Sequence, residues 1–127
     1  MCIRDRDYKA AEAEYQAYVK RFPDSAGVWQ AKLNIGTIRL SAGKPAAARK
    51  MFQAITDKYK IDVGNVPWYA IRAFYYEASA FEAEGNTAEA IARYKQLVEH
   101  RGRTSYGRRA RERLEALAKP ADSPARR

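Results

Sequence analysis

Apolar residues recur along most of this chain at steps of three and four, the spacing that places side chains on one face of an α-helix. Ala, Glu, Lys and Arg dominate, and they lose little rotamer freedom in a helix. Glycines and prolines separate the periodic stretches, as expected where helices end and begin. The pattern predicts an all-α protein with six helices at about residues 7–21, 25–42, 44–59, 67–84, 87–100 and 104–118.

Three of the predicted helices share an internal pattern. In each, a small alanine is followed four residues later by an aromatic ring, so that both side chains lie on one helix face. The alanine allows a neighbouring helix to approach closely, and the ring fills the space beside it. The three pairs are Ala11 with Tyr15, Ala48 with Phe52, and Ala90 with Tyr94.

Two glycines mark the turns between paired helices. Gly43 and Gly85 stand five residues before the second and third alanines, and glycine tolerates the left-handed conformation that closes a helix. Gly36 and Ala78 each lie seven residues before one of these turns. We expect the two helices of a hairpin to cross at these small residues, because a bulky side chain would separate them.

This set of small residue, turn glycine, alanine and aromatic, at steps of seven, five and four, resembles the tetratricopeptide repeat. The resemblance covers about residues 7–118 and implies antiparallel helical hairpins stacked as an α-solenoid. The turn glycines lie 42 residues apart, against roughly 34 in the family, and the excess falls around residues 61–67. Arg39 stands where the family prefers an aromatic residue.

Within this family the chain resembles the bacterial cell-envelope tetratricopeptide proteins. The likeness rests on residues 7–25, on the elongated hairpins and on the final helix with Ala110 and Leu114. That group includes the Tol-Pal-associated cell-division coordinator, the outer-membrane assembly lipoprotein and the ancillary subunit of the Sec translocon. The resemblance implies a periplasmic or envelope location and a bacterial source.

The two ends of the chain differ from the repeat region. Residues 1–6 resemble a translated sequencing adaptor, and we interpret them as a non-native scar. Cys2 lies among them, so it carries no information on the redox compartment. On this interpretation the chain is the C-terminal fragment of a longer protein, and the exposed apolar face of its first helix promotes self-association. Residues 119–127 are expected to form a disordered basic tail.

Residues suited to catalysis are scarce. His100 is the only histidine, and a thiolate or multi-histidine metal site is excluded once Cys2 is set aside. No two glycines have the spacing of a phosphate-binding loop. No apolar run approaches the roughly 18 residues that cross a bilayer. We therefore expect no enzyme activity, no cofactor and no metal, with a protein or peptide as the partner.

The resemblance also implies where a partner binds. In such stacks the first helix of each hairpin lines the concave face. Asn34 can bond an extended peptide backbone, Arg72 can bind a carboxylate, and the tyrosines offer a rigid surface with a polar tip. The expected partner-binding residues are Gln30, Asn34, Thr37 and Ser41 in one hairpin, and Arg72, Tyr75, Tyr76, Ser79 and Glu82 in the other.

A basic C-terminal region leaves an alternative open. The net charge is +9, and residues 101–127 hold nine Lys or Arg against three acids. This suggests a module that binds nucleic-acid phosphate or an anionic membrane, although Glu112 and Glu115 dilute the charge. The expected anion-binding residues are Arg108, Arg109, Arg111 and Arg113. A third class, a repeat domain fused to a catalytic domain upstream, also remains open.

Overall fold

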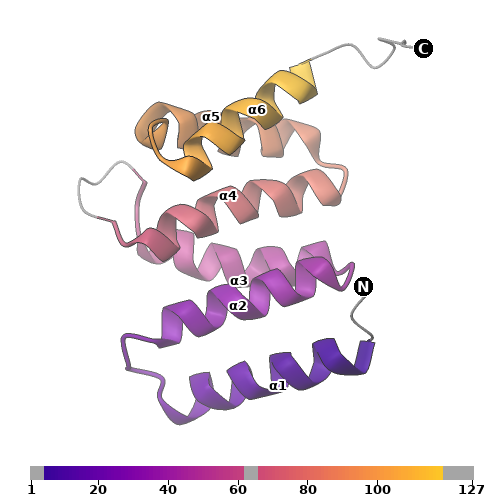
Figure 1. The fold of residues 1–127 in the computed structure, drawn as a ribbon, viewed down its shortest axis with the longest axis vertical. Coiled ribbons are helices and arrows are strands. Elements are labelled where there is room, and N and C mark those ends of the chain that lie inside the picture. The colour runs from indigo at the N-terminus through magenta and orange to yellow at the C-terminus, as the bar shows by residue number, and fades with distance from the viewer. Residues whose placement is uncertain (1–4, 62–65, 119–127) are drawn as a thin grey trace.

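The computed structural model describes residues 5–61 and 66–118. This part of the chain confirms the all-α prediction, since it folds into helices joined by short connections (Figure 1). The expected tail at 119–127 and most of the expected scar lie outside the described residues. The helices are α1 (Asp5–Arg21), α2 (Val28–Ser41), α3 (Pro45–Lys58), α4 (Trp68–Ala83), α5 (Thr87–Arg101) and α6 (Ser105–Ala118).

The second helix begins later than predicted. We expected it at residue 25, but α2 starts at Val28, with Gly27 at its N-cap position. Ser25 does not cap the helix, because its hydroxyl lies 3.1 Å from the hydroxyl of Tyr18 in α1. Its carbonyl instead accepts a hydrogen bond from the Val28 N–H, at 3.2 Å. The residue that resembled a cap therefore ties the loop to the preceding helix.

The helices stack in chain order, each antiparallel to the next, from α1 at one end to α6 at the other (Figure 1). α2 also contacts α4, and α4 contacts α6, so these three helices form one layer. α3 and α5 lie on the other side of that layer (Figure 1). Among the described helices, α1 packs against α2 alone. Such a stack has an inner layer of first helices and an outer layer of second helices.

The predicted turn glycines have the predicted conformation. Gly43 has a φ of +81° and Gly85 a φ of +85°. After α2, the Gly43 N–H donates to the Leu40 carbonyl at 3.1 Å, and the Lys44 N–H donates to the Arg39 carbonyl at 2.9 Å. These two bonds satisfy carbonyls that the helix end would leave free. α4 ends at Gly85 with the same pair of bonds.

The core has two parts, and α4 belongs to both. Its alanines Ala70, Ala73 and Ala80 pack toward α3, in a cluster with Phe52 and Ile55. Its other face carries the large side chains of the second cluster, against α5 and α6. The buried members of that second cluster are Ile61, Phe74, Ala78, Phe81, Ala90, Tyr94, Leu97 and Ala110. A helix that is apolar on both sides is buried between two neighbours.

Candidate functional site

Three tyrosines cluster across the layer that α2, α4 and α6 form. The ring of Tyr106, in α6, lies 5.4 Å from that of Tyr75 and 6.1 Å from that of Tyr76, both in α4. Tyr75 and Tyr76 meet edge-on at 5.5 Å. Tyr76 also stacks on Phe52 in α3 at 5.7 Å, which fixes one ring of the cluster to the core. The result is a half-buried cluster of rings that pack on one another.

Two arginines border these rings. The guanidinium of Arg72 lies 5.8 Å from the centre of the Tyr106 ring, and 5.9 Å from those of Tyr76 and Trp68. The Arg72 Nε atom is buried and has no hydrogen-bond partner within the described part of the chain. The guanidinium of Arg109, from α6, lies 4.9 Å from the centre of the Tyr106 ring. We call Arg72, Tyr75, Tyr76, Tyr106 and Arg109 the tyrosine–arginine cluster.

The electrostatics of the cluster favour a neutral phenol at Tyr106 beside the charged guanidiniums. Burial, together with Tyr76, raises the pKa of Tyr106 above its ordinary value of 10.0. Its hydroxyl therefore stays protonated at physiological pH and can donate a hydrogen bond. Arginine remains charged under all these conditions. The cluster can thus offer donors to a carboxylate or a backbone carbonyl, and ring faces to an apolar group.

Sequence reasoning found part of this cluster. Arg72, Tyr75 and Tyr76 were expected on one surface, and the structure brings them together. Tyr106 and Arg109 were not expected to join them as partner-binding residues. An aromatic residue in an otherwise basic helix was the available signal. That α6 lies against α4 depends on the packing of the stack and cannot be derived from spacing alone.

Ser79 and Glu82 lie in α4 but are bound to other side chains. The Tyr94 hydroxyl, in α5, donates to Glu82 Oε1 at 3.0 Å and lies 3.1 Å from Ser79 Oγ. Arg113, from α6, donates to both oxygens of Glu82. Burial raises the pKa of Tyr94 above its ordinary value, so its phenol remains a donor. The four residues connect α4, α5 and α6.

The expected binding residues of α2 lie along a different part of the layer. Gln30 and Ser41 are exposed, while Asn34 and Thr37 are half-buried. The Thr37 hydroxyl donates to the Asn34 carbonyl at 3.0 Å, a bond within the helix. Gln30 and Asn34 line a groove of about 350 Å³ together with side chains of α1. This groove is distinct from the tyrosine–arginine cluster.

The four arginines expected to bind anions have different surroundings. Arg113 pairs with Glu82, and Arg109 packs on Tyr106. Arg108 is exposed and donates to the carbonyl of Arg103 at 3.0 Å. Arg111 is exposed. Two of the four charges are therefore engaged with neighbouring side chains.

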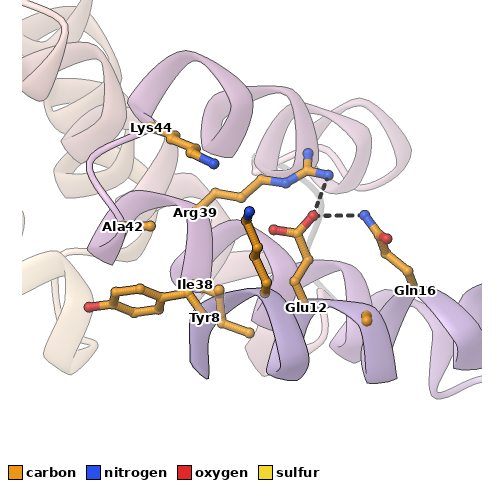
Figure 2. A pocket seen from close by; sticks show the side chains of 9 residues that line it. Tyr8, Glu12, Gln16, Ile38, Arg39, Ala42 and Lys44 are labelled. Atoms are coloured by element: carbon orange, nitrogen blue, oxygen red, sulfur yellow. Dashed lines mark hydrogen bonds and ion pairs between the residues drawn. The ribbon is translucent and has the colours of Figure 1, made fainter. Parts of the chain in front are cut away.

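A pocket of about 540 Å³ lies between α1, the end of α2 and the turn that follows (Figure 2). Two of its charged groups, Arg39 and Glu12, form an ion pair. Arg39 donates to Glu12 Oε2 at 3.0 Å, and Gln16 donates to the same oxygen at 2.8 Å. Arg39 also donates to the Ala47 carbonyl at 3.3 Å. The arginine that replaces a family aromatic thus links α1 to α2 and α3.

A second pocket, of about 300 Å³, lies between α3, α4 and α5. Glu77 lines it and is only 2% exposed. Burial raises the pKa of Glu77 above its ordinary value, although Arg93, Gln53 and Thr56 each oppose the shift. His100 lies exposed at the edge of this pocket.

Neither metal binding nor a membrane span is indicated in the described regions. Residues 5–61 and 66–118 contain no group of three His, Cys, Asp or Glu side chains that could hold a metal ion. No helix in these regions has the length and apolar character needed to cross a membrane.

Comparison with known proteins gives one family. A family profile described as the tetratricopeptide repeat matches residues 3–60 and again residues 33–106. The two overlapping matches together cover most of the chain and include the helices α1 to α5. A search of curated proteins found no significant match.

Proposed function

Because this chain belongs to the tetratricopeptide repeat family, whose repeats generally mediate interactions between proteins, we propose that it is a non-catalytic scaffold. It binds a segment of a partner protein on the concave face formed by α2, α4 and α6. The observation that carries this proposal is the state of Arg72. Its guanidinium lies among three aromatic rings, and its buried Nε has no partner in the described chain.

The chemistry of the cluster defines the partner segment. A buried donor left without an acceptor costs roughly 1 to 3 kcal/mol, so Arg72 gains if its side chain shifts to meet an incoming carboxylate or carbonyl. Hydrogen bonds between a guanidinium and a carboxylate are about twice as strong as neutral ones. Tyrosine and arginine are also the side chains that most often dominate binding energy at interfaces. The preferred segment therefore carries an acidic group beside an apolar or aromatic residue.

Binding to an array of short peptides tests this proposal. The array contains matched pairs in which each Glu or Asp is replaced by Gln or Asn, and fluorescence polarisation gives the affinities. We expect tighter binding of the acidic member. Replacing Arg72→Gln should weaken it about tenfold or more, since charge-assisted bonds contribute about 1.5 to 3 kcal/mol. Arg111→Gln is the matched control, because Arg111 is an exposed arginine of α6 outside the cluster. Equal loss in both variants would contradict the proposal.

The net charge of +9 and the exposed Arg108 and Arg111 favour a second candidate function, binding of nucleic acid or of an anionic membrane. Filter binding to a mixed-sequence DNA duplex tests the nucleic-acid case. Contacts with phosphate would make the affinity fall steeply with salt. The double variant Arg108→Gln with Arg111→Gln should then weaken duplex binding, while Arg72→Gln should not. Vesicles with and without anionic lipid test the membrane case with the same variants.

We further propose that the scaffold works in the bacterial cell envelope. The support is the resemblance of residues 7–25 and of the final helix to the envelope members of the family. Localisation of a tagged chain expressed with its native gene would test this proposal. Recovery from the cytosolic fraction would contradict it.

A further inference from the structure

The first helix exposes large apolar side chains. Tyr15 is 36% exposed, Tyr18 37% and Phe22 45%. All three lie on one face of α1 or just after its end, at steps of three and four residues. A cluster of exposed rings on one side of a helix marks an interaction surface.

The internal repeat shows that the faces of α3 and α5 that correspond to this exposed face of α1 are buried. Aligning Ala11 of α1 with Ala48 of α3 and Ala90 of α5 gives shifts of 37 and 79 residues. At these shifts Tyr15 and Tyr18 correspond to side chains that are 0 or 1% exposed. Those counterparts are Phe52 and Ile55 in α3, and Tyr94 and Leu97 in α5.

In both later hairpins a preceding helix covers this face. α2 lies against α3 so closely that a Cβ at Gly36 would be 2.5 Å from the Phe52 ring. α4 covers α5 in the same way, with Ala78 in the shared core. α1 contacts only α2 among the described helices. The groove of about 350 Å³ beside Tyr15 and Tyr18 therefore has the position at which the other hairpins hold a helix.

The far end of the stack cannot supply that helix. The surface of α6 carries exposed charged side chains at Arg108, Arg111, Glu112 and Glu115. Placing this surface on the exposed rings of α1 would bury charges without partners, which is costly. Head-to-tail growth of the stack is thus disfavoured. Of the two end helices, as far as residues 5–118 are described, α1 alone exposes large apolar side chains.

A second α1 fits the face better. Asp5–Arg21 contains four acidic and four basic residues, so it is neutral within a chain of net charge +9. Asp7 and Arg21 lie on one edge of the face, at opposite ends of the helix and fourteen residues apart. In an antiparallel pair, Asp7 of one copy lies near Arg21 of the other. The small Ala11 then lies near the large Tyr18, as Gly36 lies against Phe52.

We propose that this face of α1 is a pairing surface through which two copies of the chain associate, with their α1 helices antiparallel. The pairing covers Tyr15, Tyr18 and Phe22 in each copy. A two-fold contact of this kind closes on itself and gives a dimer rather than a filament. The pairing surface is separate from the tyrosine–arginine cluster, so a dimer presents two concave faces.

Sedimentation velocity over about 1 to 200 µM tests the pairing. The wild-type chain should sediment as a dimer at the upper end of this range. The double variant Tyr15→Glu with Tyr18→Glu should sediment as a monomer, with unchanged helical circular dichroism. Trp68→Glu is the matched control, because Trp68 is 56% exposed but belongs to α4. This control should remain a dimer.

A charge exchange tests the antiparallel orientation without altering the rings. Asp7→Arg should weaken the dimer severalfold, and adding Arg21→Asp to the same chain should restore it. A wild-type chain that is monomeric at about 200 µM would overturn the proposal. So would species that grow beyond a dimer, which would indicate head-to-tail assembly. The proposal would also be overturned if the chain stays monomeric and binds, through Tyr15, a synthetic peptide of residues 67–84, which contain α4. That result would indicate that another helix, and not a second copy, covers the face.

Discussion

Gly36 and Phe52 are packed so closely that a methyl group on Gly36 would lie 2.5 Å from Cε1 and 2.8 Å from Cζ of the phenylalanine ring. Real Cβ atoms do not approach other atoms to this distance. Phe52 is fully buried and stacks on Tyr76, so its ring has little room to move. The absence of a side chain at position 36 sets the distance between α2 and α3.

Replacing Gly36→Ala should therefore destabilise the fold. Alanine favours a helix interior by up to about 1 kcal/mol over glycine, but overpacking a core typically costs about 1 to 3 kcal/mol. We expect a net loss of about 1 kcal/mol or more in the free energy of unfolding, measured by urea denaturation. Gln30→Ala, at an exposed site of the same helix, should leave stability nearly unchanged. A gain in stability on Gly36→Ala would show that the helices can separate without cost.

Substitutions at Gly85 test the cost of its backbone conformation, separately from any effect on packing. It has a φ of +85°, and no atom lies within 4 Å of the place where its Cβ would be. Gly85→Ala should lower the free energy of unfolding by about 1 to 2 kcal/mol, because the left-handed conformation is costly for alanine. Gly85→Asn should cost less, since asparagine tolerates this conformation better. Equal losses, measured by thermal denaturation, would contradict a backbone origin.

The pair of Glu82 and Arg113 should show a measurable coupling energy. Arg113 binds both carboxylate oxygens, and the buried Tyr94 hydroxyl donates to the same group. A double-mutant cycle with Glu82→Gln and Arg113→Gln should give about 0.5 to 1 kcal/mol, falling as salt is added. The exposed pair of Glu89 and Arg93, at 3.5 Å, should give less. Equal coupling for the two pairs would count against a supporting role for Tyr94.

The stability of the fold should depend on the charge of Glu77. Burial raises the pKa of this carboxyl above its ordinary value of 4.5. The stability associated with the protonated Glu77 carboxyl is fully present when the pH is below that ordinary value. It is lost as the pH rises through the raised pKa of the folded state. Glu77→Gln, which stays neutral, should therefore unfold at a higher temperature than the wild type at pH 7. The difference should close toward pH 4.

Glu84 provides a control, because the pH dependence of its contribution to stability has the opposite sign to that of Glu77. Hydrogen bonds from Arg49, at 2.5 and 2.9 Å, lower the pKa of Glu84 below its ordinary value. Its contribution is present above that value and is lost as the pH falls through the lowered pKa. Glu84→Gln should therefore unfold at a lower temperature than the wild type at pH 7, and the difference should close in acid. The same direction for both variants would contradict the assigned shifts.

Local chemistry made the architecture predictable from the sequence. Gly43 and Gly85 end their helices because glycine adopts the left-handed conformation, and apolar residues at steps of three and four identify the helix faces without knowledge of the neighbours. The start of α2 at Val28 was harder to predict. Ser25 can cap a helix or bind another hydroxyl, and only the position of Tyr18 decides between these roles.

The candidate site was only partly predictable, because it depends on contacts between distant helices. Glu82 has the periodicity of a surface residue in α4, and nothing in its spacing indicates that Arg113 reaches it across 31 positions. The contact of Tyr106 with Tyr75 and Tyr76 is likewise not indicated by spacing, because it depends on α6 lying against α4. Arg39 departs from the family pattern, yet its link to Glu12 becomes visible only when α1 and α2 are side by side.

The place of α4 in both core clusters has a consequence for how the chain opens. A stack of repeats gains its stability from each unit and from the interfaces between neighbours. Because α4 contributes to the clusters on both of its sides, neither half of the stack can melt without exposing part of this helix. Backbone amides of α4 should exchange with deuterium most slowly. In the monomer, the rate should rise outward toward α1, which contacts only α2 among the described helices and frays first.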